Sequence, residues 1–472
     1  MSKRVLLIAP YIHDFAAYDL WLKPVGLLYV AAAVEAAGYD VRLVNCLDRL
    51  HPAASSVRRP YRSRADGEGK GKFSYEVITT PECLTGVRRK YKRYGIPLEA
   101  FLKRLSEGPP PDAVGVSSMM TYWCGGVAET VSIVREVFPG VPVILGGVYA
   151  TLCPEHAREH AGAYAVAEGP AEEKFIDILR KEIGGGTRKK AQPKLLKPAY
   201  HLLENLDSVS ILTSFGCPFS CAYCASKLLR REFSQRPTRE VVDEIVHYAQ
   251  EMGISDIAFY DDALLANPDA HIKPILREII ARGLHLRFHT PNGLHADMID
   301  GELAALIKAA GFATVRLSIE STDEARLKDS CLKVTPEGFN IAVSNLVSAG
   351  YAASEVEAYV LMGVPGQQSE EVEQTMRFVH ESGAVIRLAD FSPIPGTGYF
   401  SAAMEMYGLD PNEPLLQNSS VIPHLVPGLF EQYEELRGLA RSLNSELVAR
   451  GPVPNFRLTR GTTCHGNISG RA

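Results

Sequence analysis

The sequence predicts an α/β protein in which two parallel sheets follow one another along the chain. Short apolar segments alternate with helix-length segments over residues 1–183, and the same pattern restarts over residues 201–398. Strands separated by helices form parallel sheets, because a parallel pair needs a long crossover connection. The stretch GGGTRKKAQPK at 184–194 is rich in glycine and charge, which predicts a linker over 184–200 between the two series.

The first series predicts a Rossmann-like domain. Its expected strands are RVLLIA, DVRLVN, DAVGVSSM and VPVILGG, with helices between them. Ligands of such sheets bind at the carboxyl ends of the strands. An insertion rich in Gly, Arg and Lys at about 51–95 interrupts the pattern, and it is either a mobile lid or a solvated loop.

The second series predicts a partial (β/α)6 barrel of the TIM type. Its six expected strands are VSILTSF, DIAFYDD, LHLRFHT, TVRLSIE, VEAYVLMG and AVIRLADF, with a helical pattern between each pair. Sites in such barrels lie where the strands end and the loops begin. Residues 399–472 are expected to form a C-terminal helical segment, with a helix near 429–449, and an irregular tail.

Composition limits the classes of partner. With 46% hydrophobic and 22% charged residues, the chain has the balance of a soluble globular protein. Its net charge of −5 gives no overall basic surface, so nucleic acid is not the expected partner. The longest apolar run, VGLLYVAAAV, is about half of what a membrane span needs, and nine scattered cysteines suggest a reducing compartment. We therefore expect a cytoplasmic protein without a membrane span.

Three cysteines form the one tight cluster in the sequence. Cys217, Cys221 and Cys224 lie in GCPFSCAYCAS, directly after the first strand of the second series. Thiolates at this spacing can face one small metal cluster, as iron–sulfur centres require. A structural zinc loop or free thiols are the alternative, although zinc usually takes paired C-x-x-C units or added histidines. Three ligands for a four-iron cube leave one iron open to an external ligand.

This loop, with Tyr223 before its third cysteine, resembles the signature of the radical S-adenosylmethionine (SAM) superfamily. The resemblance implies a [4Fe-4S] cluster whose open iron is chelated by the methionyl amine and carboxylate of SAM. An electron from the cluster then cleaves the sulfonium and gives a 5′-deoxyadenosyl radical. The resemblance also implies an external electron donor of the flavodoxin or ferredoxin kind.

The same resemblance suggests further contacts to SAM at the ends of later strands. FYDDALL stands where the family usually has Gly-Gly-Glu, so either adjacent aspartate could accept from the ammonium. SIES and LMGVPGQ match the segments that contact the ribose, the methionyl carboxylate and the adenine, although the glutamate of SIES could instead be a solvated surface charge. The expected SAM-binding residues are Tyr223, Asp261, Asp262, Ser318, Glu320, Gly363 and Pro365.

A parallel sheet placed before such a barrel resembles the cobalamin-binding domain of one large radical SAM branch. Hydroxyls and paired glycines after two strands would admit the nucleotide tail of cobalamin, namely Ser117, Ser118, Gly146 and Gly147. His13 is also a candidate, but Tyr11 and Ala16 replace the Asp and Gly of the usual Asp-x-His-x-x-Gly motif. Because that imidazole lacks the aspartate that would orient it, we expect that cobalt carries no histidine nitrogen.

Cobalamin beside a radical SAM barrel usually implies methylation of an unactivated carbon, here of a small molecule or lipid. Three other functions remain open: cobalamin-dependent cyclisation or rearrangement without methyl transfer, methylthio transfer, and a cobalamin sensor or storage protein. The structural zinc loop described above also remains an alternative for the cysteines. The methylthio reading would need an auxiliary cluster, for which the candidate cysteines are Cys46, Cys83, Cys124 and Cys153.

Polar residues near strand ends are the candidate substrate contacts. They are His289, Asn292, Arg316, Glu357, Tyr359 and Asp390. Polar packing inside the barrel would explain them equally well. No residue is predicted to be a catalytic acid or base, and Cys464 of the tail, in CHG, is left out of the mechanism because a lone tail cysteine is more often inert.

Overall fold

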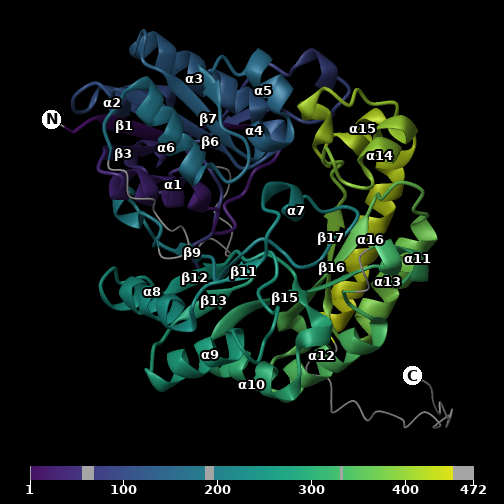
Figure 1. Cartoon of the computed structure of the whole chain (residues 1–472). Coiled ribbons are helices and arrows are strands. Elements are labelled where there is room, and N and C mark those ends of the chain that lie inside the picture. The colour runs from purple at the N-terminus through teal and green to yellow at the C-terminus, as the bar shows by residue number, and fades with distance from the viewer. Residues whose placement is uncertain (1, 56–67, 187–195, 330–332, 450–472) are drawn as a thin grey trace, which may run out of the picture.

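The computed structural model describes residues 2–55, 68–186, 196–329 and 333–449. Figure 1 shows two sheets with their helices and a C-terminal group of helices arranged around the short helix α7 (Ser226–Leu229). Most of the expected linker, part of the insertion, and Cys464 lie outside the described residues. The domain boundaries expected at 183, 201 and 398 stay predictions.

The first sheet is parallel, with the strand order β3-β1-β6-β7-β8. Its strands are β1 (Arg4–Ala9), β3 (Asp40–Asn45), β6 (Ala113–Ser118), β7 (Val143–Gly147) and β8 (Ala165–Val166). The four strands expected from the sequence are confirmed, and β8 is an addition that is too short to show a pattern.

Helices cover both faces of the first sheet, because alternate residues of each strand point to opposite sides. Val5 and Leu7 of β1 pack with helices α1 (Val25–Ala36) and α6 (Ala171–Glu182). Leu6 and Ile8 pack on the other side, with α2 (Leu98–Ser106), α3 (Cys124–Val137) and α5 (Pro154–His160).

The described part of the 51–95 insertion contains two short strands and is joined to the first domain, so it is more ordered than a solvated loop. It supplies β4 (Tyr75–Val77) and β5 (Lys92–Tyr94), which form an antiparallel sheet of order β2-β5-β4 with β2 (Ile12–Asp14). Since β2 follows β1 directly, the insertion is attached to the carboxyl edge of the first sheet, where ligands bind.

The second sheet contains the six expected strands in chain order, β9-β12-β13-β15-β16-β17, and all of their pairings are parallel. They are β9 (Val209–Ile211), β12 (Asp256–Phe259), β13 (Arg287–His289), β15 (Phe312–Glu320), β16 (Val356–Met362) and β17 (Val385–Asp390). Helices α8 (Thr238–Gln250), α9 (Ile272–Ala281), α10 (Gly301–Ala310), α12 (Pro336–Ser348) and α13 (Ser369–Glu381) connect them. The architecture is therefore the partial barrel that the sequence predicts.

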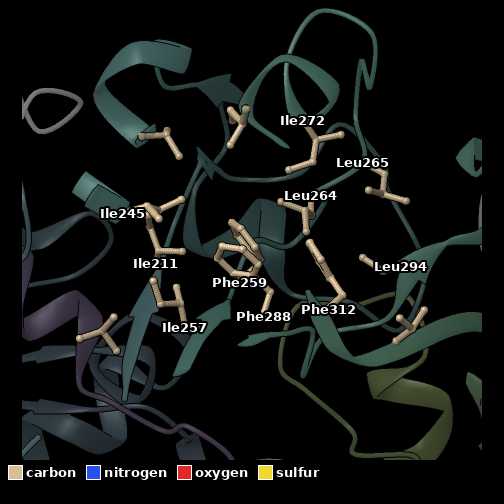
Figure 2. Packing of buried hydrophobic residues seen from close by; sticks show 14 of the residues in the cluster. Ile211, Ile245, Ile257, Phe259, Leu264, Leu265, Ile272, Phe288, Leu294 and Phe312 are labelled. Carbon is tan, nitrogen blue, oxygen red and sulfur yellow. The ribbon is translucent and has the colours of Figure 1, made fainter. Parts of the chain in front are cut away.

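Aromatic packing between the strands and the helices forms the core of the barrel. Phe259, Phe288 and Phe312 come from three neighbouring strands, and their ring centroids lie 5.2 to 5.6 Å apart. Figure 2 shows them packed beside Ile257 and Leu264. Because Phe288 faces the helices, the next residue along the strand, His289, faces the inside of the barrel.

A segment of the N-terminal part of the chain reaches the inner face of the second sheet. Trp21 is fully buried and stacks on His289, with ring centroids 4.0 Å apart. The Ser210 hydroxyl donates to the Trp21 carbonyl over 2.6 Å, and the Trp21 indole donates to the Glu68 carbonyl over 2.6 Å. The indole therefore fills space inside the barrel.

The C-terminal segment, residues 399–449, contacts both the second sheet and the small antiparallel sheet beside the first one. It contains α14 (Phe400–Tyr407), α15 (Ile422–Leu425) and α16 (Leu429–Ala449), so the expected helix near 429–449 is confirmed. Helix α16 packs on α13 and β17. The buried Asp14 carboxylate of β2 accepts from Asn418 over 2.9 Å and from the Trp123 indole over 3.0 Å. Within the described residues, no helix has the length and apolar character needed to cross a bilayer.

We expect Trp21→Ala to lower the free energy of unfolding by about 3–5 kcal/mol, because it leaves a cavity inside the barrel. The measurement is the urea midpoint followed by far-UV circular dichroism. Tyr164→Ala is the control, since 61% of Tyr164 is exposed, and it should change stability by less than about 0.5 kcal/mol. Equal midpoints for both variants would contradict the role assigned to Trp21.

Candidate active site

The cysteine loop lies at the carboxyl end of the first barrel strand, between the short strand β10 (Ser214–Phe215) and α7. Gly216 has φ +71°, and a Cβ there would lie 2.6 Å from the Glu232 carbonyl oxygen, so glycine is required to start the loop. Ala222 donates its amide to the Asp329 carbonyl over 3.0 Å and accepts from the Tyr399 amide over 3.2 Å. The loop is thus held by residues more than one hundred positions away along the chain.

The three thiols lie within electrostatic reach of one another. Burial raises the pKa of the Cys217 thiol to about 11, and Asp262, Cys224 and Cys221 add to the effect. The charges of the three thiols therefore interact at the carboxyl end of the first barrel strand.

A buried polar pocket adjoins this loop. Its lining residues are Tyr223, Glu320, Ser321, Arg326, Leu361, Val364, Gln367 and Tyr399. The Tyr223 hydroxyl is buried and has no hydrogen-bond partner within the described part of the chain. The Lys333 ammonium lies 5.5 Å from the centre of the Tyr223 ring and 3.0 Å from a Glu320 oxygen. An unpaired buried hydroxyl beside a buried cation is the arrangement expected of a site for a polar ligand.

Glu320 ends β15 in a left-handed backbone conformation, with φ +63°. Its side chain is only 14% exposed and pairs with Lys333, so the alternative of a solvated surface charge is wrong. Ser318 lies two residues earlier, before the β-bulge that separates it from Glu320, and is buried. A Cβ on Gly293 would overlap the Ser318 hydroxyl, so a glycine is needed beside it.

The two adjacent aspartates after β12 differ in their surroundings. Asp261 is buried, and its carboxylate accepts from the Thr213 amide and hydroxyl and from the Ser214 hydroxyl, over 2.6 to 3.1 Å. These bonds tie β12 to the first strand, which argues against Asp261 as a ligand of SAM. Asp262 is exposed, and desolvation by the surrounding protein raises its carboxyl pKa, while a hydrogen bond with Ser226 opposes this rise.

The glycine turn after β16 is fixed from two directions. The Gln367 side-chain oxygen accepts from the amides of Gly363 and Val364, over 2.8 and 3.2 Å. The Tyr407 hydroxyl donates to the Gly363 carbonyl over 3.1 Å, and a Cβ at Gly363, whose φ is +87°, would overlap the Tyr433 hydroxyl. Pro365 is buried in this turn.

Two of the predicted substrate contacts bind other residues of the barrel. His289 has no exposed surface, because Trp21 covers it and Asp256 binds its Nε2 at 3.0 Å. Asn292 uses its amide to donate to the carbonyls of Tyr260 and Asp261, over 3.1 Å each. His289 is therefore closed to a substrate, whereas Asn292 is half-buried, uses only its amide nitrogen in these bonds, and stays a predicted contact.

The other four predicted contacts line the barrel or its rim. Arg316 donates to Glu357 over 2.6 Å and to the Tyr359 hydroxyl over 3.2 Å, on the inner face of β15 and β16. The Tyr359 hydroxyl in turn donates to the Pro291 carbonyl over 2.8 Å. Asp390, the last residue of β17, pairs with Arg437 of α16 at 2.6 Å.

The carboxyl edge of the first sheet faces the same region. Ser117 and Ser118 are in register with Gly146 and Gly147 at the ends of β6 and β7. Gly147 has φ +89°, and a Cβ there would overlap the Ser118 carbonyl, so the four residues form a tight shelf. Helix α4 (Val148–Leu152), which starts from this shelf, contacts α7 next to the cysteine loop.

His13 is not without a carboxylate partner, as the sequence suggested, because Glu129 of α3 replaces the missing aspartate. The Nε2 atom of His13 lies 2.8 Å from Glu129, which also binds Arg93 at 2.7 Å. A Cβ on Gly125 would lie 3.1 Å from Nδ1, so that atom faces the start of α3. Both ring nitrogens are therefore directed toward α3.

Sequence reasoning missed three residues of the site. Lys333 and His295 carry no spacing signal, and Gly293 resembles an ordinary loop glycine. His295 stacks on Phe219 of the cysteine loop, with ring centroids 4.6 Å apart, and its Nδ1 has no partner among the described residues. Burial and Lys333 lower the pKa of His295 to about 4, so this imidazole is neutral near pH 7.

Two family models match the chain. The radical SAM superfamily model matches residues 211–379, and the B12 binding domain model matches residues 85–179. Cytidylyl-2-hydroxyethylphosphonate methyltransferase of Streptomyces wedmorensis is 23% identical, over 95% of this chain and 90% of that protein. An uncharacterized methyltransferase of Pyrococcus horikoshii is 29% identical, over 62% of this chain and 70% of that protein.

Solved structures show the same fold. The radical SAM methyltransferase TsrM from Kitasatospora setae superposes with a TM-score of 0.60, at 20% identity, over 86% of this chain and 76% of that one. The cobalamin-dependent SAM radical enzyme OxsB gives a TM-score of 0.54, at 12% identity, over 93% of this chain and 61% of that one.

The chain therefore joins a segment that matches the B12 binding domain model to a segment that matches the radical SAM superfamily model, which is the domain combination of the cobalamin-binding branch of that superfamily. It is an enzyme, and its cofactors are a [4Fe-4S] cluster, SAM and cobalamin.

We expect the EPR spectrum of the cob(II)alamin-loaded protein to lack nitrogen splitting from a histidine, because Glu129 binds the Nε2 atom of His13 and the Nδ1 atom faces the start of α3. The spectrum of His13→Ala should be the same as that of the native protein. A nitrogen splitting that disappears in His13→Ala would contradict this expectation.

Proposed function

We propose that the protein transfers a methyl group to an unactivated carbon of a small molecule. One observation carries the proposal: helix α4, which starts from the Ser118–Gly147 shelf, contacts α7 beside the cysteine loop. The ends of both sheets therefore meet in one space, where a cobalamin-bound methyl group and a SAM-derived radical can reach the same substrate. The methyltransferases among the related proteins support the same reaction.

The cysteine loop would hold the cluster through Cys217, Cys221 and Cys224. The match of the radical SAM model over residues 211–379, which include these three cysteines, supports a multi-iron cluster over a single zinc ion. When bound, the cluster and SAM supply a 5′-deoxyadenosyl radical, and cobalamin supplies the methyl group. An external donor of the flavodoxin or ferredoxin kind would reduce the cluster.

Residues of the polar pocket and of the strand ends around it would orient SAM. Asp262 is the accessible carboxylate that can accept from the methionyl ammonium, while Lys333, paired with Glu320, is a cation suited to the methionyl carboxylate. The unpaired Tyr223 hydroxyl, Ser318, and the turn at Gly363 and Pro365 would contact the rest of the cofactor. Burial of this pocket excludes water, which protects a radical from side reactions.

The shelf formed by Ser117, Ser118, Gly146 and Gly147 would admit cobalamin to the edge of the first sheet. Two serine hydroxyls offer hydrogen bonds there, and two glycines leave the backbone open to a close approach. His13 would support this edge through Glu129 instead of ligating cobalt.

Cyclisation without methyl transfer is the second candidate. It is favoured by similarity to the anaerobic magnesium-protoporphyrin IX monomethyl ester cyclase of Rubrivivax gelatinosus, which is 23% identical over 61% of this chain. The names of the relatives include a cytidylyl phosphonate, a bacteriochlorophyllide and a hopanoid. Because these compounds are chemically unrelated, the relatives do not identify the substrate of this chain.

Reduced holoenzyme is expected to form both 5′-deoxyadenosine and S-adenosylhomocysteine from SAM, measured by liquid chromatography. Replacement of Cys217, Cys221 and Cys224 by alanine should remove 5′-deoxyadenosine formation and bring the iron content from about four per chain to near zero. Cys83→Ala is the matched control, because Cys83 is an exposed cysteine outside the loop.

The possible results separate the candidates. 5′-Deoxyadenosine without S-adenosylhomocysteine would favour cyclisation, and iron retained by the triple variant would reveal the auxiliary cluster of a methylthiotransferase. Zinc in the native loop would contradict radical chemistry altogether.

Gly147→Ala is expected to weaken cobalamin binding at least about tenfold, because its Cβ would overlap the Ser118 carbonyl. Gly140→Ala is the matched control, since Gly140 also has a positive φ, +80°, but nothing lies within 4 Å of its Cβ position. Equilibrium dialysis followed by the cobalamin absorbance measures the affinity. Equal affinities of the two variants would contradict the shelf as the cobalamin site.

A further inference from the structure

The His295 side chain lies against the cysteine loop, and the proposed function gives it no role. Its ring stacks on that of Phe219, with centroids 4.6 Å apart and an angle of 22° between the ring planes. Phe219 stands between Cys217 and Cys221 in the sequence and packs against Cys217 in one apolar cluster. The imidazole is therefore one side chain away from a proposed ligand of the iron–sulfur cluster.

Strand pairing fixes the direction of this side chain. His295 ends β14 (Leu294–His295), which pairs in parallel with β15. Leu294 is in register with Leu317, and His295 is in register with Ser318. Leu294 and Leu317 are buried in the barrel core, where Figure 2 shows Leu294. Because neighbouring residues of a strand face opposite sides, His295 and Ser318 are directed away from that core, on the side of the expected SAM contacts.

The imidazole has an unpaired nitrogen. His295 is only 3% exposed, and its Nδ1 atom is buried without a hydrogen-bond partner among the residues that the structure describes. By contrast, the buried His271 lies 3.0 Å from the Thr213 hydroxyl, and the buried His289 lies 3.0 Å from Asp256. An unpaired buried polar atom is unfavourable, because it has lost its hydrogen bonds to water. We therefore expect the partner of this Nδ1 atom to come from a bound molecule.

The charges near this imidazole suit a negative partner. Burial and the charge of Lys333 lower the pKa of His295 to about 4, so the ring is neutral and carries one N–H group. Lys333 itself lies 3.0 Å from Glu320 and 5.5 Å from the centre of the Tyr223 ring, in the region assigned to SAM. A cluster held by thiolates and the methionyl carboxylate of SAM are both negative hydrogen-bond acceptors. A negative acceptor would keep the proton of the imidazole on Nδ1.

We propose that the Nδ1–H group of His295 donates a hydrogen bond to a negative acceptor of the bound cofactors, either a sulfur atom of the cluster or the methionyl carboxylate of SAM. The inference rests on the proposed place of the cluster at the cysteine loop, but it does not depend on methyl transfer. Such a bond would fix the cofactors against β14, next to Ser318.

Three substitutions separate the donor from the ring. His295→Phe keeps an aromatic ring for Phe219 but has no N–H group, whereas His295→Asn loses the ring and places an amide N–H near the position of Nδ1. His295→Gln carries its amide further out, near the position of Nε2, and should behave as His295→Phe does. Each full-length variant is reconstituted with iron and sulfide, and its iron content and melting temperature show whether the cluster and the fold are retained.

A potentiometric titration without SAM tests the cluster sulfur, with the EPR signal of the reduced cluster as the readout. A hydrogen bond to sulfur stabilises the reduced, more negative cluster. If the cluster is the acceptor, His295→Phe and His295→Gln should lower the ratio of reduced to oxidised cluster at a fixed potential by at least about threefold. His295→Asn should restore a ratio close to that of the native protein.

Equilibrium dialysis of SAM against the oxidised holoenzyme tests the methionyl carboxylate. If this carboxylate is the acceptor, the potential without SAM stays unchanged, and His295→Phe and His295→Gln should bind SAM at least about tenfold more weakly. His295→Asn should again be close to the native protein. A shifted potential thus assigns the acceptor to the cluster, and weaker SAM binding at an unchanged potential assigns it to SAM.

His380→Phe is the matched control. His380 is also buried, at 7% exposure, and its Nδ1 atom also lacks a hydrogen-bond partner within the described part of the chain. It lies in the last turn of α13, which leads to the start of β17, so it is at the end of the barrel opposite the cysteine loop. Neither the potential nor the SAM affinity should change in this variant.

Two results would overturn the inference. One is a native potential together with native SAM affinity in His295→Phe, and the other is His295→Asn that is as impaired as His295→Phe. Either result, in a protein that holds four iron atoms and cleaves SAM, would refute this inference alone. A native protein that holds no such cluster would refute the proposed cluster site instead.

Discussion

The contact between helix α4, at the carboxyl edge of the first sheet, and helix α7, beside the cysteine loop, is the constraint on which the rest of the site depends. Loops at the carboxyl ends of the strands are the natural ligand-binding positions of each sheet. Three contacts between distant parts of the chain hold the arrangement: Trp21 against His289, Asn418 on Asp14, and helix α4 against α7. Without them, each sheet would present its loops separately, and the two cofactors would have no fixed relation.

Whether a buried charged or polar group has a partner helps to distinguish residues that stabilise the fold from residues that could contact a ligand. Buried ions away from the site are paired, as in the Arg236–Glu244 pair, whose side chains are 1% and 0% exposed. Such pairing is expected, since an isolated buried charge is very unfavourable. Near the site, the Tyr223 hydroxyl and the His295 Nδ1 atom are buried without a partner among the described residues.

Departures from the family pattern are compensated by the local structure. Asp262 offers a carboxylate where the family usually has Gly-Gly-Glu, and Asp261 beside it is used to join β12 to the first strand. Glu129 provides the carboxylate that the sequence around His13 lacks. Glu129 lies far from His13 along the chain, whereas Asp262 is the immediate neighbour of Asp261 and is exposed where Asp261 is buried.

Local patterns in the sequence determined the strands, the order of the sheets and the cysteine loop, because alternation, helical period and ligand spacing act between near neighbours. Strand alternation also placed His289 and Arg316 on the inner face of the barrel. Tertiary structure alone decided that Trp21 covers His289, that Lys333 joins Glu320, and that Asn418 meets Asp14 at a separation of 404 residues. These contacts join residues that share no periodicity, so only the folded chain, which brings distant side chains together, could decide which positions stay open to a ligand.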